Sequence, residues 1–356
     1  MTIENDDLRA AVSAGLLTEP QAASLTKLAD ERRGYRAATA QIDEPFELFK
    51  GFNEIFIVVG LIILYSGWTA ITGIAAFTSN ADKGGSFLIY GAVQLGVVGL
   101  MTVYFTLKRR MIAPSIALSI FFGLGALQVG FALVQITSAP AAMAMAIAAG
   151  VAAISLMLYW YFFRIPFSLM ISGLAVFAFA IGLSSSGGAQ INGPSDLFLL
   201  TTGWPFSIIT ISLGLCAFFI ALSFDMSDPH RVTRRSANGF WLHVLAAPAI
   251  VNSIALTLYS NSTAISFLLL TLFLLLIALI AIIIDRRSFL ISGIGYMIAL
   301  IFTILDGSYG MVVLLIGLGL VLIGSNWERL RCKLMNALPD FKAKDKLPPW
   351  NTTAKD

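Results

Sequence analysis

Residues 266–284 read Ser-Phe-Leu-Leu-Leu-Thr-Leu-Phe-Leu-Leu-Leu-Ile-Ala-Leu-Ile-Ala-Ile-Ile-Ile, a run without a charged residue. A helix that crosses the apolar core of a bilayer needs about 20 consecutive apolar residues, which is the length of this run. A transmembrane β-strand would instead alternate apolar and polar residues over about ten positions. Since the run does not alternate, it predicts a membrane-spanning α-helix.

The composition of the whole chain agrees with this prediction. Of the 356 residues, 58% are hydrophobic and only 12% are charged, whereas soluble domains carry about 25% charged residues. This shortage of charge excludes a large soluble enzyme, a nucleic-acid-binding module and a disordered chain. We therefore expect a polytopic membrane protein whose partner is the lipid bilayer and which binds no nucleic acid.

Ten stretches are long and apolar enough to span a membrane. The predicted fold is an all-α, polytopic transmembrane bundle of about ten spans. The stretches cover residues 55–77, 87–107, 111–135, 141–163, 165–184, 204–224, 239–259, 264–284, 288–305 and 309–324.

Lysine and arginine are distributed unevenly over the segments that separate these stretches. The two termini and the loops after the second, fourth, sixth and eighth stretches hold 22 of the 23 Lys and Arg residues. Lys83 alone falls on the opposite side. Because cytoplasmic segments concentrate lysine and arginine, we expect an even number of spans with both termini in the cytoplasm.

The N-terminal segment, residues 1–43, predicts a cytoplasmic helical hairpin in front of the bundle at 55–324. Its first helix stops at Gly15, and its second begins at Thr18, which with Gln21 forms a capping box. The hairpin is too small to fold firmly by itself. We therefore expect residues 1–40 to pack on a protein partner, on a second copy of the chain or on the membrane domain.

Residues 44–54 and 325–338 predict amphipathic helices that lie at the membrane interface. The first carries phenylalanines at helical spacing, and the second is basic, as is typical of a helix against anionic lipid. After Pro339 the chain is polar, so residues 339–356 are predicted to be disordered. The apolar face of the second helix is predicted to consist of Trp327, Leu330, Leu334 and Leu338.

A short repeat suggests that the bundle is built from tandem helical hairpins. Ser168-Leu-Met-Ile-Ser-Gly173 and Ser288-Phe-Leu-Ile-Ser-Gly293 agree at four of six positions. Each follows cytoplasmic arginine and opens an outgoing span. We interpret this as a parallel repeat flanked by one extra span at each end, with a chance match between apolar helices as the alternative.

No Asp, Glu, Lys or Arg lies in the middle of a predicted span, which weighs against an ion pump or a proton-coupled antiporter. The candidate midplane polar residues are the amides Gln94, Gln128 and Asn252. They could line a polar path for a neutral solute, or they could hold helices together through hydrogen bonds, which is the commoner role of such amides. Pro248, four residues before Asn252, would add a kink.

Arginines gather at the predicted cytoplasmic rim, where they could bind lipid phosphate. Asp225, Asp228 and His230 in the sixth loop, with His243 beyond it, could instead bind a metal or act on a headgroup, but their spacing matches no known mechanism. A solvated basic turn, with His243 in the interfacial belt, is the third interpretation. We predict no catalytic residue, no metal and no cofactor. The candidate phosphate-binding residues are Arg164, Arg231, Arg234, Arg235, Arg286 and Arg287.

The segment Gly15-Leu-Leu-Thr-Glu-Pro-Gln21, followed by many spans with arginine-tipped turns, resembles the bacterial membrane proteins classified as domain of unknown function twenty-one fifty-seven. The resemblance covers the hairpin and the first half of the bundle. It implies a bacterial cytoplasmic membrane, and it implies no activity and no functional residue.

Two functions remain open from the sequence. The tandem hairpins, the Pro248 kink and the midplane amides favour a permease or flippase-like carrier of a neutral or amphiphilic solute. The N-terminal hairpin and the lack of charge within the spans favour a membrane scaffold or regulatory protein that does not transport. An enzyme that acts on lipid headgroups is a third and weaker hypothesis.

Overall fold

The computed structural model describes residues 5–33, 51–78, 83–202, 204–304 and 309–350, with some side chains next to the gaps left undescribed. It is 83% helix, with thirteen α-helices and no strand among the described residues. Eight helices are long and apolar enough to cross a membrane. The chain is thus an all-helical protein of the multi-pass membrane class.

Each of the ten predicted stretches coincides with one helix. The first eight helices are the candidate spans, and α12 and α13 are shorter, with 17 residues each. The ten helices are α4 (Phe52–Thr78), α5 (Lys83–Thr102, extended by a π-helical segment Val103–Lys108), α6 (Ile112–Ile136), α7 (Ala144–Phe163), α8 (Pro166–Ser186), α9 (Trp204–Ser227), α10 (Arg234–Ser260), α11 (Ala264–Ile284), α12 (Ser288–Ile304) and α13 (Tyr309–Ser325).

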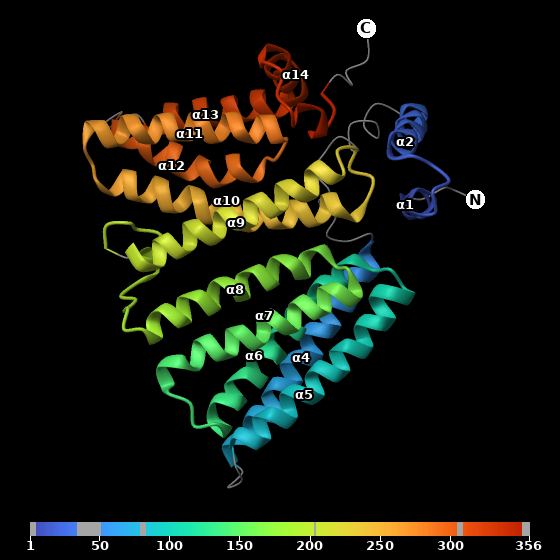
Figure 1. The fold of residues 1–356 in the computed structure, drawn as a ribbon, viewed down its shortest axis with the longest axis vertical. Helices are drawn as coiled ribbons and strands as arrows, with labels where there is room; N and C mark the ends of the chain where they lie inside the picture. Colours follow the sequence, from blue (N-terminus) through green and yellow to red (C-terminus); the bar gives the residue numbers. More distant parts are fainter. Residues whose placement is uncertain (1–4, 34–50, 79–82, 203, 305–308, 351–356) are drawn as a thin grey trace. The chain divides into compact units, whose positions relative to one another are not determined.

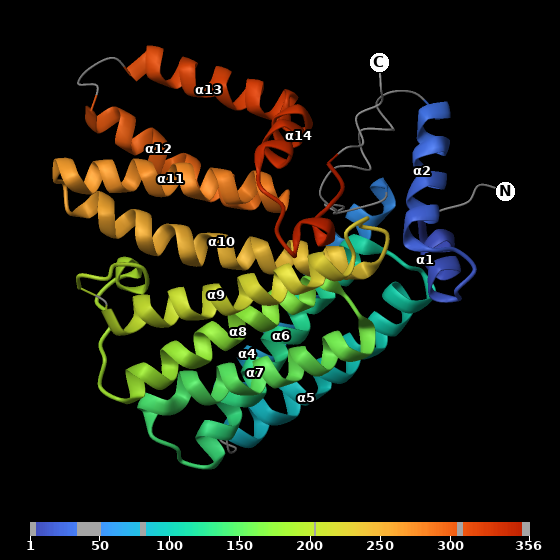
Figure 2. The same cartoon turned by 45° about the horizontal axis from the view of Figure 1, so that its top comes forward.

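The helices form two compact units, each of which is described here by itself. The α4–α8 unit consists of Glu47–Leu197 together with Gly203–Thr210. The α9–α14 unit consists of Ile211–Asp356 with Met1–Phe46 and Phe198–Thr202, so it also contains the N-terminal helices. In Figure 1, α5, α6, α7 and α8 run beside one another, and in Figure 2 the same holds for α10, α11 and α12.

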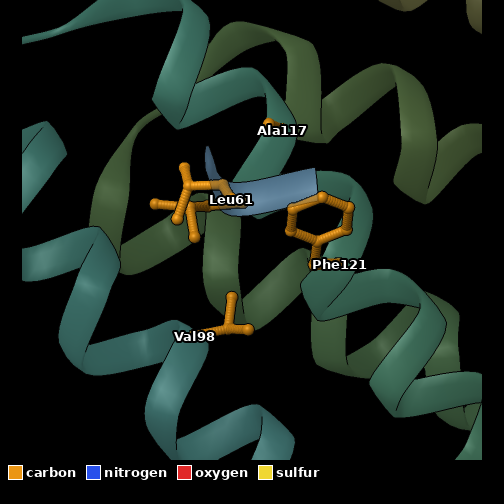
Figure 3. Close-up of a cluster of buried hydrophobic side chains, with 5 residues drawn as sticks. Leu61, Val98, Ala117 and Phe121 are labelled. Carbon is orange, nitrogen blue, oxygen red and sulfur yellow. The ribbon is translucent and has the colours of Figure 1, made fainter. Parts of the chain in front are cut away.

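The core of the α4–α8 unit is apolar where α4, α5 and α6 meet. Leu61 of α4, Val98 of α5 and Phe121 of α6 are buried together with Ala117 and Leu118 (Figure 3). Phe121 also stacks on Tyr65, with the ring centroids 4.4 Å apart. In a membrane, such packing replaces lipid contacts by tighter contacts between side chains.

Small residues let the helices of this unit approach closely. A methyl group at Gly130 of α6 would collide with the backbone of Ala148 of α7, and one at Gly182 of α8 would lie 2.6 Å from the backbone nitrogen of Ala146. Close approach of backbones is the ordinary use of small residues where no hydrophobic effect drives helices together. The alanine-rich start of α7 is therefore a packing surface.

Among the described residues, six non-glycine residues with positive φ mark turns, three in each unit and in the same order along the chain. From Arg110 to Arg231 is 121 residues, from Ser138 to Ser262 is 124, and from Arg164 to Asp285 is 121. L-residues other than glycine adopt this conformation uncommonly. Its recurrence in matching turns supports a repeat of α5–α8 by α9–α12, flanked by α4 and α13.

Two helices lie within the part of the N-terminal segment that the structure describes, residues 5–33. Helix α1 (Asn5–Ser13) ends before Gly15, whose φ is +73°, and α2 (Glu19–Arg33) begins after Thr18. The backbone N–H of Thr18 donates to Oε1 of Gln21 at 3.0 Å, which is the backward half of the predicted capping box. The predicted entry helix at 44–54 lies mostly outside the described residues.

The C-terminal segment departs from two predictions. Helix α14 (Trp327–Ala337) exists, but its buried face consists of Trp327, Arg331 and Met335, whereas Leu330 is exposed. The face differs because Arg331 has buried partners that hydropathy does not reveal. The tail at 339–350 is ordered rather than disordered, since Arg331 donates to the carbonyls of Pro348 (2.6 Å) and Pro349 (2.9 Å).

Candidate functional site

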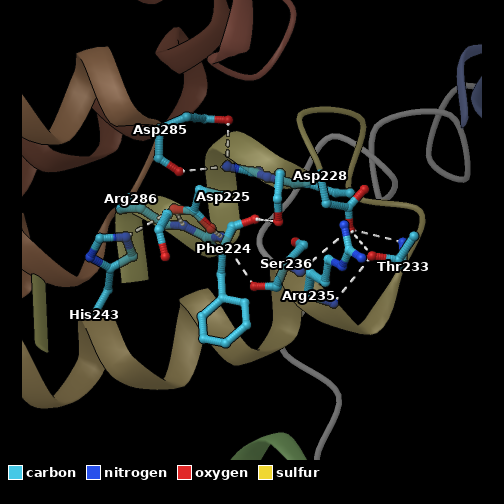
Figure 4. A network of polar contacts seen from close by, with 12 residues as sticks. Phe224, Asp225, Asp228, Thr233, Arg235, Ser236, His243, Asp285 and Arg286 are labelled. Atoms are coloured by element: carbon cyan, nitrogen blue, oxygen red, sulfur yellow. Dashed lines mark hydrogen bonds and ion pairs between the residues drawn. The ribbon is translucent and has the colours of Figure 1, made fainter. Parts of the chain in front are cut away.

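A group of buried charged side chains joins the α9–α10 turn, the α11–α12 turn and α14, all within the α9–α14 unit. We call it the turn cluster. Figure 4 shows most of it, and its side chains are 0–9% exposed. Its members are Asp225, Asp228, Arg231, His243, Asp285, Arg286, Trp327 and Arg331.

Asp225, near the end of α9, lies at the centre of the cluster. Its carboxylate accepts two hydrogen bonds from Arg286, one of them from Nε at 3.0 Å, and is 2.9 Å from Nε2 of His243 on α10. Arg286 also donates to the carbonyl of Ser236 at 3.2 Å. A side chain at Gly239 would collide with the Asp225 carboxylate, so this glycine makes the approach of α10 possible.

Asp285, the left-handed residue that ends α11, has a second set of partners. Arg231 Nη2 lies 3.0 Å from Oδ2 and donates to the backbone carbonyl of Asp285 at 2.8 Å. Trp327 Nε1 donates to Oδ1 at 2.6 Å, and Arg331 lies 3.9 Å away. Burial acts to raise the pKa of Asp285, but Arg231, Arg331, Trp327 and Arg286 together hold it below the usual value.

The two turns therefore exchange ion pairs crosswise. Asp225 precedes the α9–α10 turn and binds Arg286 of the α11–α12 turn, while Asp285 of that second turn binds Arg231 of the first. Each pair fixes one turn against the other. Breaking a buried pair of this kind leaves an uncompensated charge, which costs about 3–5 kcal/mol.

Asp228 serves the start of α10. Its carboxylate accepts hydrogen bonds from the backbone N–H of Val232 (3.1 Å) and Thr233 (2.9 Å) and from the Thr233 hydroxyl (2.7 Å). A carboxylate at a helix N-terminus satisfies donors that have no partner within the helix. Burial nevertheless raises the pKa of Asp228, and the hydrogen bonds from Thr233, Val232 and Ser236 oppose that rise.

The cluster has the chemistry of a structural clamp. It contains three carboxylates and three guanidinium groups, so the formal charges balance when His243 is neutral. Within the described ranges no three His, Cys, Asp or Glu residues lie close enough to hold a metal ion. His243 lies inside the cluster and has no exposed surface, so the interpretation that placed it in an interfacial belt is wrong.

The six arginines of the predicted phosphate-binding rim fall into two groups. Arg231 and Arg286 are bound within the turn cluster, and Arg287 is half-buried with its guanidinium 5.5 Å from the Trp327 ring centroid. Arg164 is exposed and lies over the rings of Trp160 and Tyr161. Arg164, Arg234 and Arg235 are the exposed members of the set.

Two of the three midplane amides tie α5 to α6. Gln94 of α5 donates from Nε2 to the carbonyl of Phe121 on α6 at 2.8 Å, and Gln128 of α6 donates to the carbonyl of Phe87 on α5 at 3.2 Å. The two ties lie seven residues, or about two turns, apart on both antiparallel helices. This is the interhelical use of such amides. Asn252 of α10 is half-buried.

A cavity of about 210 Å³ lies among α4, α5 and α6, beside the Gln94 tie. Its walls are mostly apolar, and Tyr65, Trp68 and Gln94 supply its polar atoms. Sequence reasoning selected Gln94 but missed Tyr65 and Trp68. Both residues could have been selected from the sequence, because a tyrosine or tryptophan inside an apolar run has a polar O–H or N–H group that usually needs a hydrogen-bond partner.

The N-terminal hairpin lies against the α9–α10 turn within its own unit. Arg9 Nε donates to the carbonyl of Val232 at 3.1 Å, and Leu8 and Ala22 are buried. On the other side α2 presents a wide apolar groove of about 480 Å³. The groove is lined by Leu17, Pro20, Gln21, Ser24, Leu25 and Leu28.

Comparison with known proteins gives this arrangement no established counterpart. No family model, no curated protein and no solved structure matches the chain. The described residues form eight helices long and apolar enough to cross a membrane, a buried ionic clamp, two amide hydrogen bonds between α5 and α6 beside a cavity, and an N-terminal hairpin held by Arg9.

Proposed function

We propose that the chain spans a bacterial cytoplasmic membrane ten times, with both termini in the cytoplasm. Two contacts support this arrangement. Arg9 joins the N-terminal hairpin to the α9–α10 turn, and Arg331 joins α14 to the α11–α12 turn. Both turns belong to the side on which lysine and arginine concentrate. The relation to the family of unknown function named above is likewise a proposal, which rests on residues 15–21.

Cysteine labelling tests the sidedness. Cys216 and Cys332 are first replaced by serine, and single cysteines are then placed at Ser13 and at Ser262, both exposed. A membrane-impermeant thiol reagent added to intact cells should label Ser262→Cys, and it should label Ser13→Cys only after the membrane is opened. Labelling of Ser13→Cys in intact cells would overturn the topology.

Within this topology we infer a scaffold or regulatory function that is exerted through the N-terminal hairpin. The observation that carries the inference is that the hairpin is anchored on one side and open on the other. Its α1 side is held to the α9–α10 turn through Arg9, while Leu16, Leu25 and Leu28 remain exposed. Leu25 and Leu28 lie on α2 and Leu16 lies in the turn before it, and we call these three side chains the leucine row. Exposed leucines of this kind are suited to dock against the apolar face of a helix of another protein.

The interior of both units favours this function over transport. Gln94 and Gln128 use their amide groups to join α5 to α6, and the crosswise ion pairs fix the α9–α10 and α11–α12 turns. Groups that are committed to partners in the protein are poor linings for a water-filled path. We therefore assign these polar groups to the stability of the bundle.

Photocrosslinking in native membranes tests the docking function. A photoreactive amino acid is placed at Leu25 in the leucine row, and a control is placed at Ser13, which is also exposed. We expect a discrete adduct with another protein from Leu25 only, and we expect Leu28→Asp to abolish it. An adduct with lipid alone, or equal adducts at both positions, would overturn the proposal.

A carrier of an amphiphilic solute is the second candidate function, and the cavity beside Gln94 is the observation that favours it. Single cysteines at Gln94, Gln128 and Asn252 distinguish the two functions. A carrier would allow labelling by an impermeant reagent from either side of the membrane in turn. A scaffold would leave all three cysteines unlabelled.

A further inference from the structure

Three exposed basic side chains at one end of the α4–α8 unit have no carboxylate partner among the described residues. Lys108 and Arg109 lie at the α5–α6 turn, and Arg164 lies at the α7–α8 turn. Glu54, the acidic residue described at this end, is buried and bound to the backbone at the start of α6. The described part of the unit therefore leaves these three charges open to an outside anion.

Helices α5 and α7 bring the two turns together. The hydroxyl groups of Thr102 on α5 and Tyr159 on α7 are buried and 2.8 Å apart, and the π-helical segment after Thr102 also contacts α7. Arg109 and Arg164 each follow this contact by a short length of helix, and Figure 1 shows the two turns at the same end of the unit. The bases therefore belong to one surface.

Aromatic side chains support both arginines. The Arg164 guanidinium lies 5.4 Å from the ring centroid of Trp160 and 5.1 Å from that of Tyr161. The Arg109 guanidinium lies 5.7 Å from the ring centroid of Tyr104, and its Nε donates to the Tyr104 hydroxyl at 3.2 Å. A ring attracts the planar cation but takes up few of its five N–H donors. Both guanidinium groups therefore keep donors for an anion.

The backbone at Arg164 gives a separate reason to assign a role to its side chain. With a φ of 54°, it occupies the left-handed position that ends α7, where glycine is the usual residue. Asp285 occupies the matching position of the other unit, and its side chain binds Arg231 and Trp327. The Arg164 guanidinium has no such polar partner within the described chain, so its partner has to come from outside.

The neighbours of these bases favour a lipid over a soluble anion. The side chains of Tyr104, Leu107, Tyr161 and Phe162 are 44–70% exposed, so the charges lie next to an exposed apolar face. Aromatic residues of this kind are typical of the membrane interface. A phospholipid offers the matching pair of parts, because its phosphate accepts two parallel hydrogen bonds from a guanidinium while its acyl chains cover apolar side chains.

We propose that Arg109 and Arg164, together with Lys108, form a binding surface for the phosphate of an anionic phospholipid such as phosphatidylglycerol. Of these three residues, only Arg164 belongs to the set of arginines selected from the sequence. The surface goes beyond the scaffold function. Its assignment to the cytoplasmic leaflet rests on the topology proposed above, whereas lipid binding itself can be measured in detergent, where the protein has no sides.

The α9–α14 unit supplies a control of equal charge. Arg234 and Arg235 are exposed at the start of α10, but the carboxylate of Asp228 lies at the same helix start. The N-terminal hairpin is also hydrogen-bonded to the turn that precedes them. Protein groups therefore neutralise and cover this turn, and we expect it to contribute little to lipid binding.

The test uses the full-length protein, freed of lipid in detergent and titrated with phosphatidylglycerol or phosphatidylcholine. Native mass spectrometry counts the bound lipid. Both lipids carry a phosphate, but the choline group of the second adds a compensating positive charge. We expect phosphatidylglycerol to bind at least about fivefold more tightly, which corresponds to the attraction of one basic residue for an anionic lipid. An excess of glycerol phosphate, which lacks acyl chains, should not displace it.

Two double variants locate the lipid. Arg109→Gln with Arg164→Gln should abolish the preference for phosphatidylglycerol, whereas Arg234→Gln with Arg235→Gln removes the same charge and should retain it. All four arginines are exposed, so neither double variant leaves a buried charge without a partner. Thermal unfolding in the same detergent confirms that both variants are folded.

Four results would overturn the proposal. Equal binding of the two lipids by the native protein would mean that the surface does not select an anionic headgroup. Equal losses in the two double variants would mean that binding follows net charge alone. A preference that survives Arg109→Gln with Arg164→Gln would place the lipid elsewhere, and displacement by glycerol phosphate would assign the surface to a soluble phosphate. None of these results bears on the leucine row, which crosslinking from Leu25 tests.

Discussion

The matching turns of the two units have the same backbone and opposite surroundings. Arg164 ends α7 and Asp285 ends α11, and both residues are left-handed, with φ of 54° and 59°. Arg164 is exposed and rests on two aromatic rings, whereas Asp285 is buried among Arg231, Trp327 and Arg331. The comparison teaches that the turn geometry is set locally, while the side-chain chemistry at the turn depends on what packs against it.

The two units also differ in how they fix an earlier pair of matching turns, the α5–α6 turn and the α9–α10 turn. In the α4–α8 unit, Glu54 of α4 is buried and its carboxylate accepts from the backbone N–H of Ile112 and Ala113 at the start of α6. In the α9–α14 unit the start of α10 is served by Asp228 from within the same turn. A carboxylate at a helix start is common to both, but it comes from a distant helix in one and from the local chain in the other.

The largest expected effect is a difference in the free energy of unfolding between a variant at Asp285 and the matching variant at Arg164. Asparagine tolerates the left-handed conformation, so Asp285→Asn and Arg164→Asn change charge without changing the backbone. We expect Asp285→Asn to lower the free energy of unfolding by about 3 kcal/mol, because Arg231 and Arg331 lose a buried partner. Arg164→Asn should cost less than about 1 kcal/mol.

Thermal unfolding of the purified protein in one detergent measures both variants side by side. Equal losses of stability would mean that the turn cluster contributes no more than an exposed arginine, and the distinction between the two units would fail.

A double-mutant cycle on Asp225 and Arg286 sharpens the comparison. Each single change, Asp225→Leu or Arg286→Met, strands a buried charge, so each should destabilise by about 3 kcal/mol. The double variant should lose clearly less than the sum of the two single losses, giving a coupling energy of at least about 1–2 kcal/mol. Additive losses, measured by the same unfolding assay, would show that the ion pair itself is not what holds the two turns together.

The stability of the α9–α14 unit should depend on pH through Asp285 only under acid conditions. The pKa of Asp285 in the folded protein is below its usual 3.8, so the ionised carboxylate stabilises the fold above about pH 4 and stability is lost as the pH falls through the folded pKa. Asp228 makes stability depend on pH in the opposite direction. Because burial raises the pKa of its carboxyl in the folded protein, its contribution to stability decreases as the pH rises through that raised pKa.

The difference in melting temperature between the native protein and Asp285→Asn should therefore be constant from pH 8 to pH 5 and should narrow below about pH 4. Narrowing between pH 7 and pH 6 would contradict the lowered pKa of Asp285.

The smallest effects concern the amide ties of the first unit. Gln94→Leu and Gln128→Leu should each cost about 0.6–1.7 kcal/mol, the range measured for hydrogen bonds between membrane helices. Thermal unfolding in the same detergent measures both variants beside the unchanged protein. A loss of stability in neither variant would mean that the two amides do not hold α5 and α6 together.

Sequence patterns predicted the helical elements well because those elements depend on local chemistry. Each apolar run became a helix, Gly15 ended α1, and Gln21 bonded back to Thr18. The pattern failed at α14. The spacing of Leu330, Leu334 and Leu338 predicted one buried face, and the structure instead buries Arg331 on another. Hydropathy ranks arginine as exposed, and only a partner that is distant in sequence, here Asp285, makes its burial possible.

The candidate sites show the same division. The sequence alone determined that the chain is helical with runs long and apolar enough to cross a membrane, that its charges lie near the helix ends, and that Gln94 and Gln128 are amides inside apolar helices, because these follow from residue type and from position along an apolar run. The tertiary structure decided the partners: Asp225 with Arg286, Asp285 with Arg231, Arg9 with Val232, and Gln94 with the carbonyl of Phe121. The physical reason is that ion pairs and cavities join residues from different helices, and a linear pattern carries no distance between them.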